Sequence, residues 1–348
     1  MESANLITLA IETSCDETSA SVLENEKVMS NVISSQLFHT KFGGVVPEVA
    51  SREHLKKITE ITYEALKRSD KKLSDIELIC ATSGPGLIGA LLIGLNFGKS
   101  LSAVLNVPFV PVNHIQAHLY SNFLSGQKAE FPFLGLIISG GHTLLILAED
   151  FFKHKIIGST VDDAAGEAYD KTAKLLGLEY PGGKQIDDNS KKGDKDFHKF
   201  PISHLKNNEF DFSFSGIKTA VLYFLRDIDY NNNDIKDEKL LYDICASFQE
   251  TMVKTLFDKT LKAAKKFKVK NIAVSGGVSA NSGLRERFYE LKEKGYNVYF
   301  PDTEYSTDNA AMIGLTGYLK FIHSKNKEYY KLESLAQKAY PKLNYSEF

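Results

Sequence analysis

The sequence predicts an α/β fold made of two similar lobes, and two observations support this expectation. Residues 6–11 and 20–23 are short apolar runs on either side of a polar segment, as in a β-hairpin. Residues 133–138 and 143–148 repeat this arrangement about half a chain later, around the turn Ser139-Gly140-Gly141-His142. Because helical and strand-like patterns alternate between the two hairpins, we expect α/β architecture with an internal duplication.

The segment after the first hairpin predicts a helix, a strand and a second helix. Residues 54–68 carry apolar side chains at helical spacing, and residues 76–81 form an apolar run that ends in a glycine–proline turn. Residues 87–105 then predict an apolar helix that contains Gly89, Gly94 and Gly98. Each glycine costs a helix interior roughly 1 kcal/mol, so we expect close packing of this helix against a neighbouring backbone.

The carboxyl-terminal part predicts a strand at 271–274, a glycine turn at 275–277 and a helix over 279–292 that begins at Asn281. A strand that leads through a glycine-rich turn into a helix amino terminus is typical of a phosphate or nucleotide site. Residues 227–238, with three consecutive asparagines and mixed charges, predict an exposed insertion.

The composition of the 348-residue chain, 43% hydrophobic and 25% charged, is that of a soluble globular protein with two cores. The first apolar run is too short for a signal peptide, and no apolar stretch reaches membrane-spanning length without interruption, so we expect a cytoplasmic protein without membrane contact. Cys15, Cys80 and Cys245 are too scattered for a disulfide framework or a cysteine metal site. The net charge of −2 means that binding of nucleic acid would need local basic patches or a partner subunit.

His114 and His118 are four residues apart, so on a helix their imidazoles would share one face and could share a metal. The alternative is a pair of buried, hydrogen-bonded histidines. A metallopeptidase of the HExxH type would need glutamate after the first histidine, where this chain has Ile115. Asp308 precedes a helix rich in glycine and alanine, a position that favours helix capping.

Glu12, Asp16 and Glu17 place three carboxylates in the first hairpin turn, where they could act as a base, support a metal ligand or simply form the turn. The glycine turns at 139–141 and 275–277 offer backbone N–H groups without side-chain bulk, as anion binding requires. Basic residues gather in two places, which we interpret as solvated helix faces, with contact to a tRNA backbone as the alternative. They are Lys191, Lys192, Lys195, His198 and Lys199, and Lys262, Lys265, Lys266, Lys268 and Lys270.

Together these segments resemble one family, the universal tRNA N6-threonylcarbamoyladenosine transferases. The resemblance extends from about residue 6 to about residue 317 and rests on motifs that occur in the family's order. They are IETSCDET (11–18), GGVVPE with ASREH (43–54), NHIQAH (113–118), SGGHT (139–143), YPGG (180–183), FSFSGIKT (212–219) and SGGVSAN (275–281).

The resemblance implies the actin-like, Hsp70 and sugar-kinase ATPase superfold, two similar lobes with nucleotide and metal in the central cleft. The expected lobes are 1–112 plus about 312–348, and about 113–311, with most of the metal and nucleotide site in the second. His114, His118 and Asp308 are implied as ligands of one divalent metal, iron(II) in preference to zinc, with coordination positions left open. The implied substrate contacts are Ile137, Ile138, Ser139, Gly140, Gly141, Asp170, Gly183, Asp187 and Asn281.

The implied reaction moves the threonylcarbamoyl group of L-threonylcarbamoyl-adenylate to N6 of the adenosine 3′ of the anticodon. It acts on tRNAs that read codons beginning with A, forms t6A and releases AMP. Asp16 or Glu17 is our candidate for the catalytic base. The family resemblance also implies tRNA, a paralogous partner subunit of the same superfold and a small P-loop ATPase as partners. A zinc peptidase and a non-catalytic ATP-binding scaffold remain as alternatives.

Overall fold

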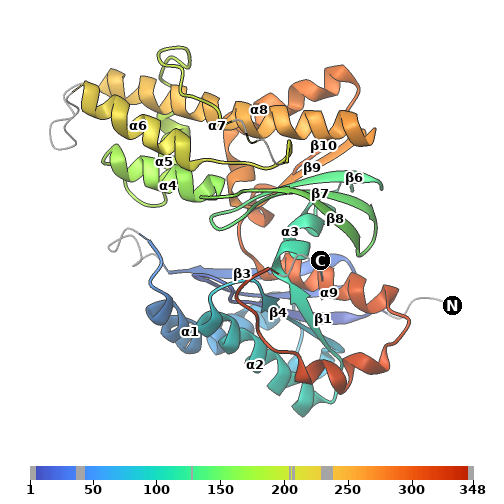
Figure 1. Cartoon of the computed structure of the whole chain (residues 1–348). Coiled ribbons are helices and arrows are strands. Elements are labelled where there is room, and N and C mark those ends of the chain that lie inside the picture. Colours follow the sequence, from blue (N-terminus) through green and yellow to red (C-terminus); the bar gives the residue numbers. More distant parts are fainter. Residues whose placement is uncertain are drawn as a thin grey trace. The chain divides into compact units, whose positions relative to one another are not determined.

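A computed structural model describes residues 5–36, 44–126, 128–203, 205, 208–228 and 238–343. The chain forms two compact units (Figure 1): unit 1 comprises Met1–Lys128 and Pro301–Phe348, and unit 2 comprises Ala129–Phe300. Most of the expected insertion at 227–238 lies outside the described residues, as does Gly43 of the second motif.

Unit 1 is built on a five-stranded sheet in the order β3-β2-β1-β4-β5. The first hairpin forms as predicted, because β1 and β2 pair antiparallel, while β4 joins β1 in parallel. The strands are β1 (Ile7–Glu12), β2 (Glu17–Glu24), β3 (Lys27–Ser35), β4 (Leu78–Gly84) and β5 (Phe109–Asn113). The helices are α1 (Pro47–Arg68), α2 (Ile88–Leu105), α3 (His114–Tyr120) and α9 (Ala310–His323), with short 3-10 helices η2 (Leu73–Asp75), η3 (Ser121–Phe123), η6 (Thr303–Tyr305), η7 (Glu328–Tyr330) and η8 (Glu333–Ala336).

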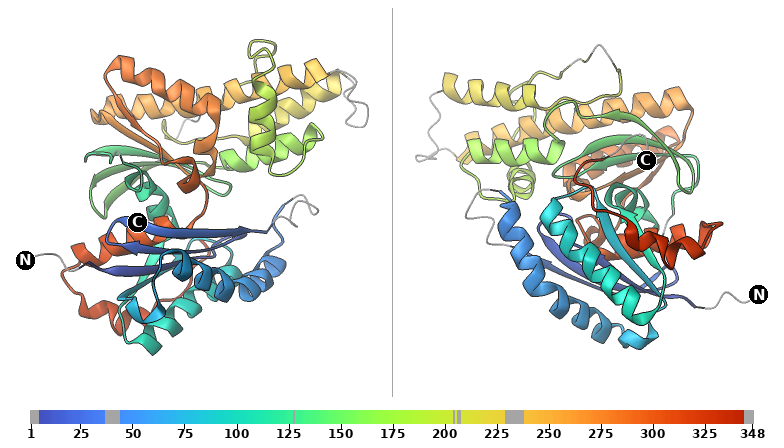
Figure 2. Two further views of the ribbon diagram at one scale, coloured as in Figure 1. Left: turned by 180° about the vertical axis from the view of Figure 1, so that it is seen from behind. Right: turned by 60° about the horizontal axis from the view of Figure 1, so that its bottom comes forward.

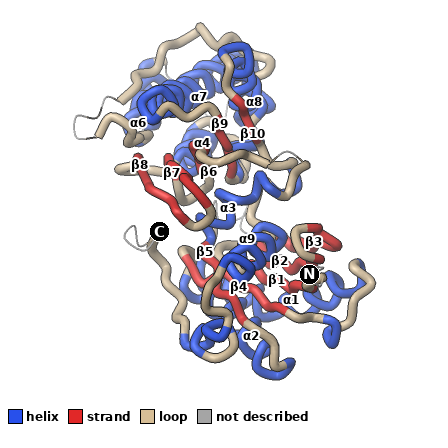
Figure 3. Tube along the Cα trace, turned by 90° about the vertical axis from the view of Figure 1, so that its right-hand side faces the viewer, coloured by secondary structure: helices blue, strands red, loops and turns tan. Residues whose placement is uncertain are grey.

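The two faces of this sheet are covered by different helices, as Figure 3 shows for α2 and α9 on either side of β1 and β4. Leu9 and Ile11 of β1 pack with Ile58 of α1 in one apolar cluster. On the other face Ala10 lies against Gly314 of α9, where an added β-carbon would come within 3.1 Å of it. Because both faces are buried, β1 is apolar throughout apart from Thr8 and Glu12.

The glycines of α2 confirm the predicted close packing. A β-carbon added at Gly94 would overlap the hydroxyl of Thr13, and one added at Gly98 would lie 3.1 Å from the β-carbon of Ala81. In the described part of the chain, α2 is the one helix whose length and apolar composition would suit a membrane span, and 33% of that window is buried inside the protein. A helix that packs on a sheet meets the same criterion, and α2 packs on β4 and β1.

Unit 2 repeats the topology of unit 1, with a sheet in the order β10-β9-β6-β7-β8. β6 pairs antiparallel with β7 and parallel with β9, as β1 does with β2 and β4. The strands are β6 (Phe133–Ile138), β7 (Thr143–Asp150), β8 (Lys153–Ser159), β9 (Asn271–Ser275) and β10 (Asn297–Tyr299). The predicted duplication is therefore present in the strand order of the two sheets.

Helices of unit 2 gather on one side of its sheet (Figure 2), and their apolar side chains form one core with β6 and β7. They are α4 (Ala165–Leu175), α5 (Gly182–Ser190), α6 (Ser215–Asp227), α7 (Glu238–Phe267) and α8 (Ser282–Tyr289), with 3-10 helices η4 (Gly277–Ala280) and η5 (Glu290–Lys294).

The two units do not divide where the sequence-based expectation placed the lobes. That expectation put residues 113–311 in the second lobe, whereas the compact units divide after residue 128 and before residue 301. The reason is α3, which packs against α9, β5 and β4, all elements of unit 1. His114, His118 and Asp308 therefore belong to unit 1, and not to the lobe that was expected to hold them.

Candidate functional site

The start of α3 fixes the two histidines immediately after the sheet. The side-chain oxygen of Asn113, the last residue of β5, accepts hydrogen bonds from the backbone N–H groups of Ile115 (2.8 Å) and Gln116 (3.0 Å). This cap begins the helix at His114, so that His114 and His118 lie on one face with ring centroids 4.6 Å apart. The helical condition on which the metal interpretation depended is thus confirmed.

Asp308 reaches the same place from the opposite end of the sequence. Its Oδ1 lies 3.0 Å from Nε2 of His118 and 3.5 Å from Nε2 of His114. The capping role that the sequence favoured for Asp308 is wrong, because Asn309 is the cap of α9 and accepts from the N–H of Met312 at 3.1 Å. The carboxylate of Asp308 is therefore directed to the histidines.

These three side chains fit a metal ion. Their candidate ligand atoms all lie within 4.8 Å of one another. Ligands held at about 2.0–2.1 Å in tetrahedral geometry are roughly 3.3 Å apart, close to the two separations from Asp308. Two imidazole nitrogens and one carboxylate oxygen form a donor set suited to iron or zinc, and three protein ligands leave further positions open.

Glu12 contacts the ring nitrogen of His114 that is not directed toward Asp308. Its Oε2 lies 3.3 Å from Nδ1 of His114, and the hydroxyl of Ser14 lies 3.2 Å from the same nitrogen. The carboxylate is fully buried and also accepts hydrogen bonds from the backbone N–H of Ser14 and the hydroxyl of Thr82, each at 2.5 Å. A carboxylate on the second ring nitrogen fixes the tautomer of a metal-binding histidine and raises its basicity.

The two carboxylates of the cluster favour the positively charged form of His114. Burial lowers the pKa of His114, but Asp308 and Glu12 outweigh it and hold that pKa well above its usual value. Burial likewise raises the pKa of Asp308, yet His114 and His118 hold it well below its usual range. Burial lowers the pKa of His118. Because a metal must displace the proton on His114, metal affinity is expected to rise with pH.

Replacing Glu12 by glutamine tests this arrangement. The amide keeps the size of the side chain but removes the charge that orients His114, so metal affinity should fall about 10- to 100-fold. Metal-competition titration with a chromophoric chelator measures this loss. An unchanged affinity in folded Glu12→Gln protein would show that Glu12 does not act through His114.

The two candidate bases lie next to each other where the turn after β1 leads into β2. Glu17 is the first residue of β2 and is partly buried, whereas Asp16 belongs to the turn itself. Burial raises the pKa of Glu17 well above its usual value, and the charges of Asp16 and Asp308 add to this effect. A carboxyl group with such a pKa can exchange a proton nearer to neutrality than an exposed one.

Unit 2 places the expected nucleotide contacts at the ends of its strands. Ile137 and Ile138 end β6, and Ser139, Gly140 and Gly141 form the turn to β7. A β-carbon added at Gly140 or Gly141 would meet nothing within 4 Å. The turn is thus open beside both glycines. Its other side is in close contact with the start of α4, because an added β-carbon at Gly166 would lie 2.7 Å from the carbonyl oxygen of Ser139.

Two of the remaining expected contacts, Asp187 and Asn281, are linked by hydrogen bonds through Gln249. The side-chain oxygen of Asn281 caps α8 by accepting from the N–H of Leu284 (2.9 Å), and its Nδ2 donates to Oε1 of Gln249 (2.6 Å). Nε2 of Gln249 in turn donates to Oδ1 of Asp187 (3.1 Å). The same oxygen of Asp187 accepts from the hydroxyl of Ser282 at 2.8 Å. This network fixes Asp187 and Asn281 in one place, although they are far apart in the sequence.

Asp170 contacts the start of α5, where its Oδ1 accepts from the N–H of Gly182, the residue before Gly183, at 2.8 Å. The structure also adds residues that the sequence did not single out, namely Gln249, Ser282, Thr82 and the supporting contact of Ser14. Gln249 lies within a long helix and belongs to no motif, so its sequence position carried no signal.

Comparisons with known proteins show which family the chain resembles. Residues 27–315 match the sequence family described as tRNA N6-adenosine threonylcarbamoyltransferase. A relative of that name from Kosmotoga olearia is 51% identical over 314 residues, which is 90% of this chain and 92% of the relative. Another from Christiangramia forsetii is 46% identical over 336 residues, 95% of this chain and 97% of the relative.

Among solved structures, HypF from T. kodakarensis has a TM-score of 0.61 at 15% identity, over 94% of this chain and 49% of HypF. The activator of 2-hydroxyisocaproyl-CoA dehydratase from Clostridium difficile, with bound ADPNP, has a TM-score of 0.52 at 13% identity, over 92% of this chain and 99% of the activator. At such identities the likeness concerns the fold alone, and it confirms the expected ATPase superfold of two similar α/β halves.

Proposed function

Because the chain belongs to the tRNA N6-adenosine threonylcarbamoyltransferase family, we propose that its donor is L-threonylcarbamoyl-adenylate. The chain is a transferase that modifies tRNA, and the observation that carries this conclusion is the match over most of its length at 51% identity. The acceptor is N6 of the adenosine 3′ of the anticodon, in tRNAs that read codons beginning with A. The products are t6A and AMP.

The reaction needs help at the acceptor, since the lone pair of an exocyclic adenine amine is delocalised into the ring. N6 forms a bond to the carbamoyl carbon, the bond from that carbon to the phosphate oxygen breaks, and AMP leaves with the electron pair. The amine also loses a proton. Asp16 or Glu17 accepts it, and the raised pKa of Glu17, caused by burial and by Asp16 and Asp308, supports the second choice.

His114, His118 and Asp308 hold the metal ion of this site, with iron(II) in preference to zinc. The support is the convergence of two imidazole nitrogens and one carboxylate oxygen, together with the position of Glu12 behind His114. When bound, such an ion supplies Lewis-acid stabilisation of oxygen atoms. Glu12 and Ser14 set the orientation of the His114 ring.

The donor nucleotide binds in unit 2 at the turn Ser139-Gly140-Gly141. The open space beside both glycines supports contact between backbone N–H groups and phosphate. Ile137, Ile138 and Gly183 contribute backbone and small-residue surface. Asp170, together with Asp187 and Asn281, which are linked through Gln249, forms the polar part of the site. Carboxylates are suited to ribose hydroxyls.

A methyl group at Gly141 tests this donor site. Since the added carbon meets no protein atom within 4 Å, Gly141→Ala should keep the stability of the parent protein. If donor phosphate approaches the turn, however, KM for the adenylate should rise about tenfold through lost hydrogen bonding. An unchanged KM would remove this turn from the donor site, whatever the outcome for the overall reaction.

The partners of the reaction include tRNA, whose target adenosine lies in a single-stranded loop and can enter a pocket without duplex opening. With a net charge of −2, this chain is expected to share tRNA binding with a paralogous subunit of the same superfold and a small P-loop ATPase. Lys262 and Lys266 pair with Glu209, which favours the interpretation of that basic cluster as a solvated helix face. We place the protein in the cytoplasm, without membrane contact.

The reaction is tested by mass analysis of nucleosides from tRNA incubated with threonine, bicarbonate, ATP, this protein and its partner proteins. Threonylcarbamoyladenosine should form with the parent protein and not with His114→Ala. Absence of product with folded protein and active partners would favour a non-catalytic ATP-binding scaffold. Metal-dependent cleavage of a protein substrate would instead revive the peptidase alternative.

A further inference from the structure

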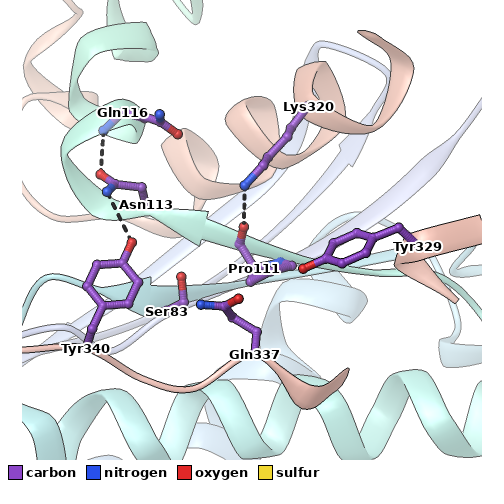
Figure 4. Close-up of a pocket in the computed structure, with 8 residues that line it drawn as sticks. All are labelled: Ser83, Pro111, Asn113, Gln116, Lys320, Tyr329, Gln337 and Tyr340. Carbon is purple, nitrogen blue, oxygen red and sulfur yellow. Dashed lines mark hydrogen bonds between the residues drawn. The ribbon is translucent and has the colours of Figure 1, made fainter. Parts of the chain in front are cut away.

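Unit 1 contains a second polar site, which is lined by residues other than the metal ligands and which we call the tail pocket (Figure 4). Its polar lining comes from β4, the β5–α3 junction, α9 and the segment after α9: Ser83, Asn113, Gln116, Lys320, Gln337 and Tyr340. The cavity measures about 160 Å³. This space is large enough for several water molecules or one small organic ion.

Lys320 brings a positive charge into this cavity. Its ammonium donates to the carbonyl oxygen of Pro111 at 3.2 Å, the contact drawn in Figure 4. Among the described residues, no carboxylate lies within 4.0 Å of it, and none of the residues that line the pocket is acidic. Burial lowers the pKa of Lys320. A partly buried ammonium with a single carbonyl partner retains capacity for an anion.

Gln116 adds a second polar group with unused hydrogen-bonding capacity. Its side chain is only 8% exposed, lines the pocket, and makes no side-chain hydrogen bond with any residue in the described ranges. Its amide atoms are not among the buried unpaired atoms of the described residues, so they face the open space of the pocket and are free to bond water or a ligand there. The hydroxyl of Tyr329 also points into this region, toward Pro111 (Figure 4).

The walls of the pocket are held in place by the chain that follows α9. The N–H of Tyr340 donates to the carbonyl oxygen of Ser83 at 2.9 Å, and its hydroxyl accepts from Nδ2 of Asn113 at 3.1 Å. On the same wall, Nζ of Lys99 donates to the carbonyl oxygen of Gln337 at 2.5 Å. The cavity is therefore bounded by groups that already have fixed positions, as expected of a preformed binding site.

We propose that the tail pocket binds a small oxyanion, either a short carboxylate or inorganic phosphate. Lys320 pairs with the charge, and the amide of Gln116 forms a hydrogen bond with an oxygen of the ligand. A free amino acid fits less well, because the lining offers no carboxylate for its ammonium group. None of the residues that line the pocket belongs to the set proposed for the adenylate donor, so the two sites are separate.

The test is a binding titration of the full-length, metal-loaded protein with acetate, lactate and inorganic phosphate, and with chloride as the control anion. Ligand-observed NMR follows the carboxylates, and phosphorus line broadening follows phosphate. At least one oxyanion should bind saturably to the parent protein. Comparison of lactate with phosphate identifies which kind of oxyanion the pocket prefers.

Three variants assign the binding to this pocket. Lys320→Met should weaken it about 10- to 100-fold, and Gln116→Leu should weaken it by about threefold or more. Lys325→Met removes an exposed charge beyond the end of α9 and should leave the affinity unchanged. Since methionine is similar in length and removes an uncompensated charge, Lys320→Met is expected to fold, as circular dichroism would verify. If it does not fold, Gln116→Leu makes the assignment.

Two results would overturn the proposal. One is the absence of saturable binding of all three oxyanions to the parent protein. The other is equal affinity in the parent, Lys320→Met and Gln116→Leu proteins, which would place the anion elsewhere, for example at the metal. Neither result bears on transfer to tRNA, because the titration contains neither tRNA nor adenylate.

Discussion

Asp308→Asn protein should lose its bound metal and transfer threonylcarbamoyl to tRNA at least about 100-fold more slowly than the parent protein. The substitution removes the one anionic ligand, whose Oδ1 lies 3.0 Å from His118 and 3.5 Å from His114. It leaves two buried imidazoles beside a neutral amide, which is a weak ligand for iron or zinc. The shape of the site is otherwise kept.

The measurement combines metal analysis of the purified protein with nucleoside analysis of the tRNA product. Asp302→Asn is the matched control, because Asp302 is an exposed carboxylate six residues earlier in the same segment. The control should bind metal and react like the parent protein. Full transfer activity in metal-free Asp308→Asn protein would show that the triad is not required for the reaction.

Gly276→Ala should destabilise unit 2 by about 2–4 kcal/mol. Gly276 has φ 89° and ψ 164°, a region that is essentially restricted to glycine. A β-carbon there would also lie 2.5 Å from the carbonyl oxygen of Ile138, closer than real β-carbons approach backbone atoms. The turn must therefore shift away from β6, and Asn281 shifts with it through η4.

Gly277→Ala is the control for this prediction, since an added β-carbon at Gly277 meets nothing within 4 Å. Its stability should remain within about 0.5 kcal/mol of the parent value. The chain has no tryptophan, so urea unfolding is best followed by far-ultraviolet circular dichroism. Equal stability of the two alanine variants would contradict the strain and close contact assigned to Gly276.

The sequence predicted elements well where apolar runs were bounded by turns, and less well elsewhere. Both hairpins and α2 lie where expected. The strand β5 was not predicted. It contains Pro111, a residue that is rare within sheets and is accommodated here because β5 is at the edge of its sheet. Of α7, only the basic face near its carboxyl end was predicted, since the rest is buried around much of its circumference and carries buried polar residues such as Asp243 and Gln249.

The residues of the candidate site were likewise predicted only in part. Spacing alone suggested His114 and His118 as a pair, because helical geometry is local. Asp308 became a candidate ligand only through the family resemblance, as its contact with His118 joins residues 190 positions apart. The supporting contacts of Ser14 and Gln249 depend on side-chain packing between distant segments, for which the sequence contained no periodic signal.

The division of the chain has a consequence for its synthesis. Unit 1 needs residues from both sides of unit 2, and α9, which packs on β1, β2 and β4, leaves the ribosome after all of Ala129–Phe300. Unit 2 can therefore bury its core during translation, while one face of the β1–β5 sheet still lacks its covering helix. Unit 1 can thus be completed only after unit 2 has been synthesised, and the three candidate metal ligands come together only when Asp308 has emerged.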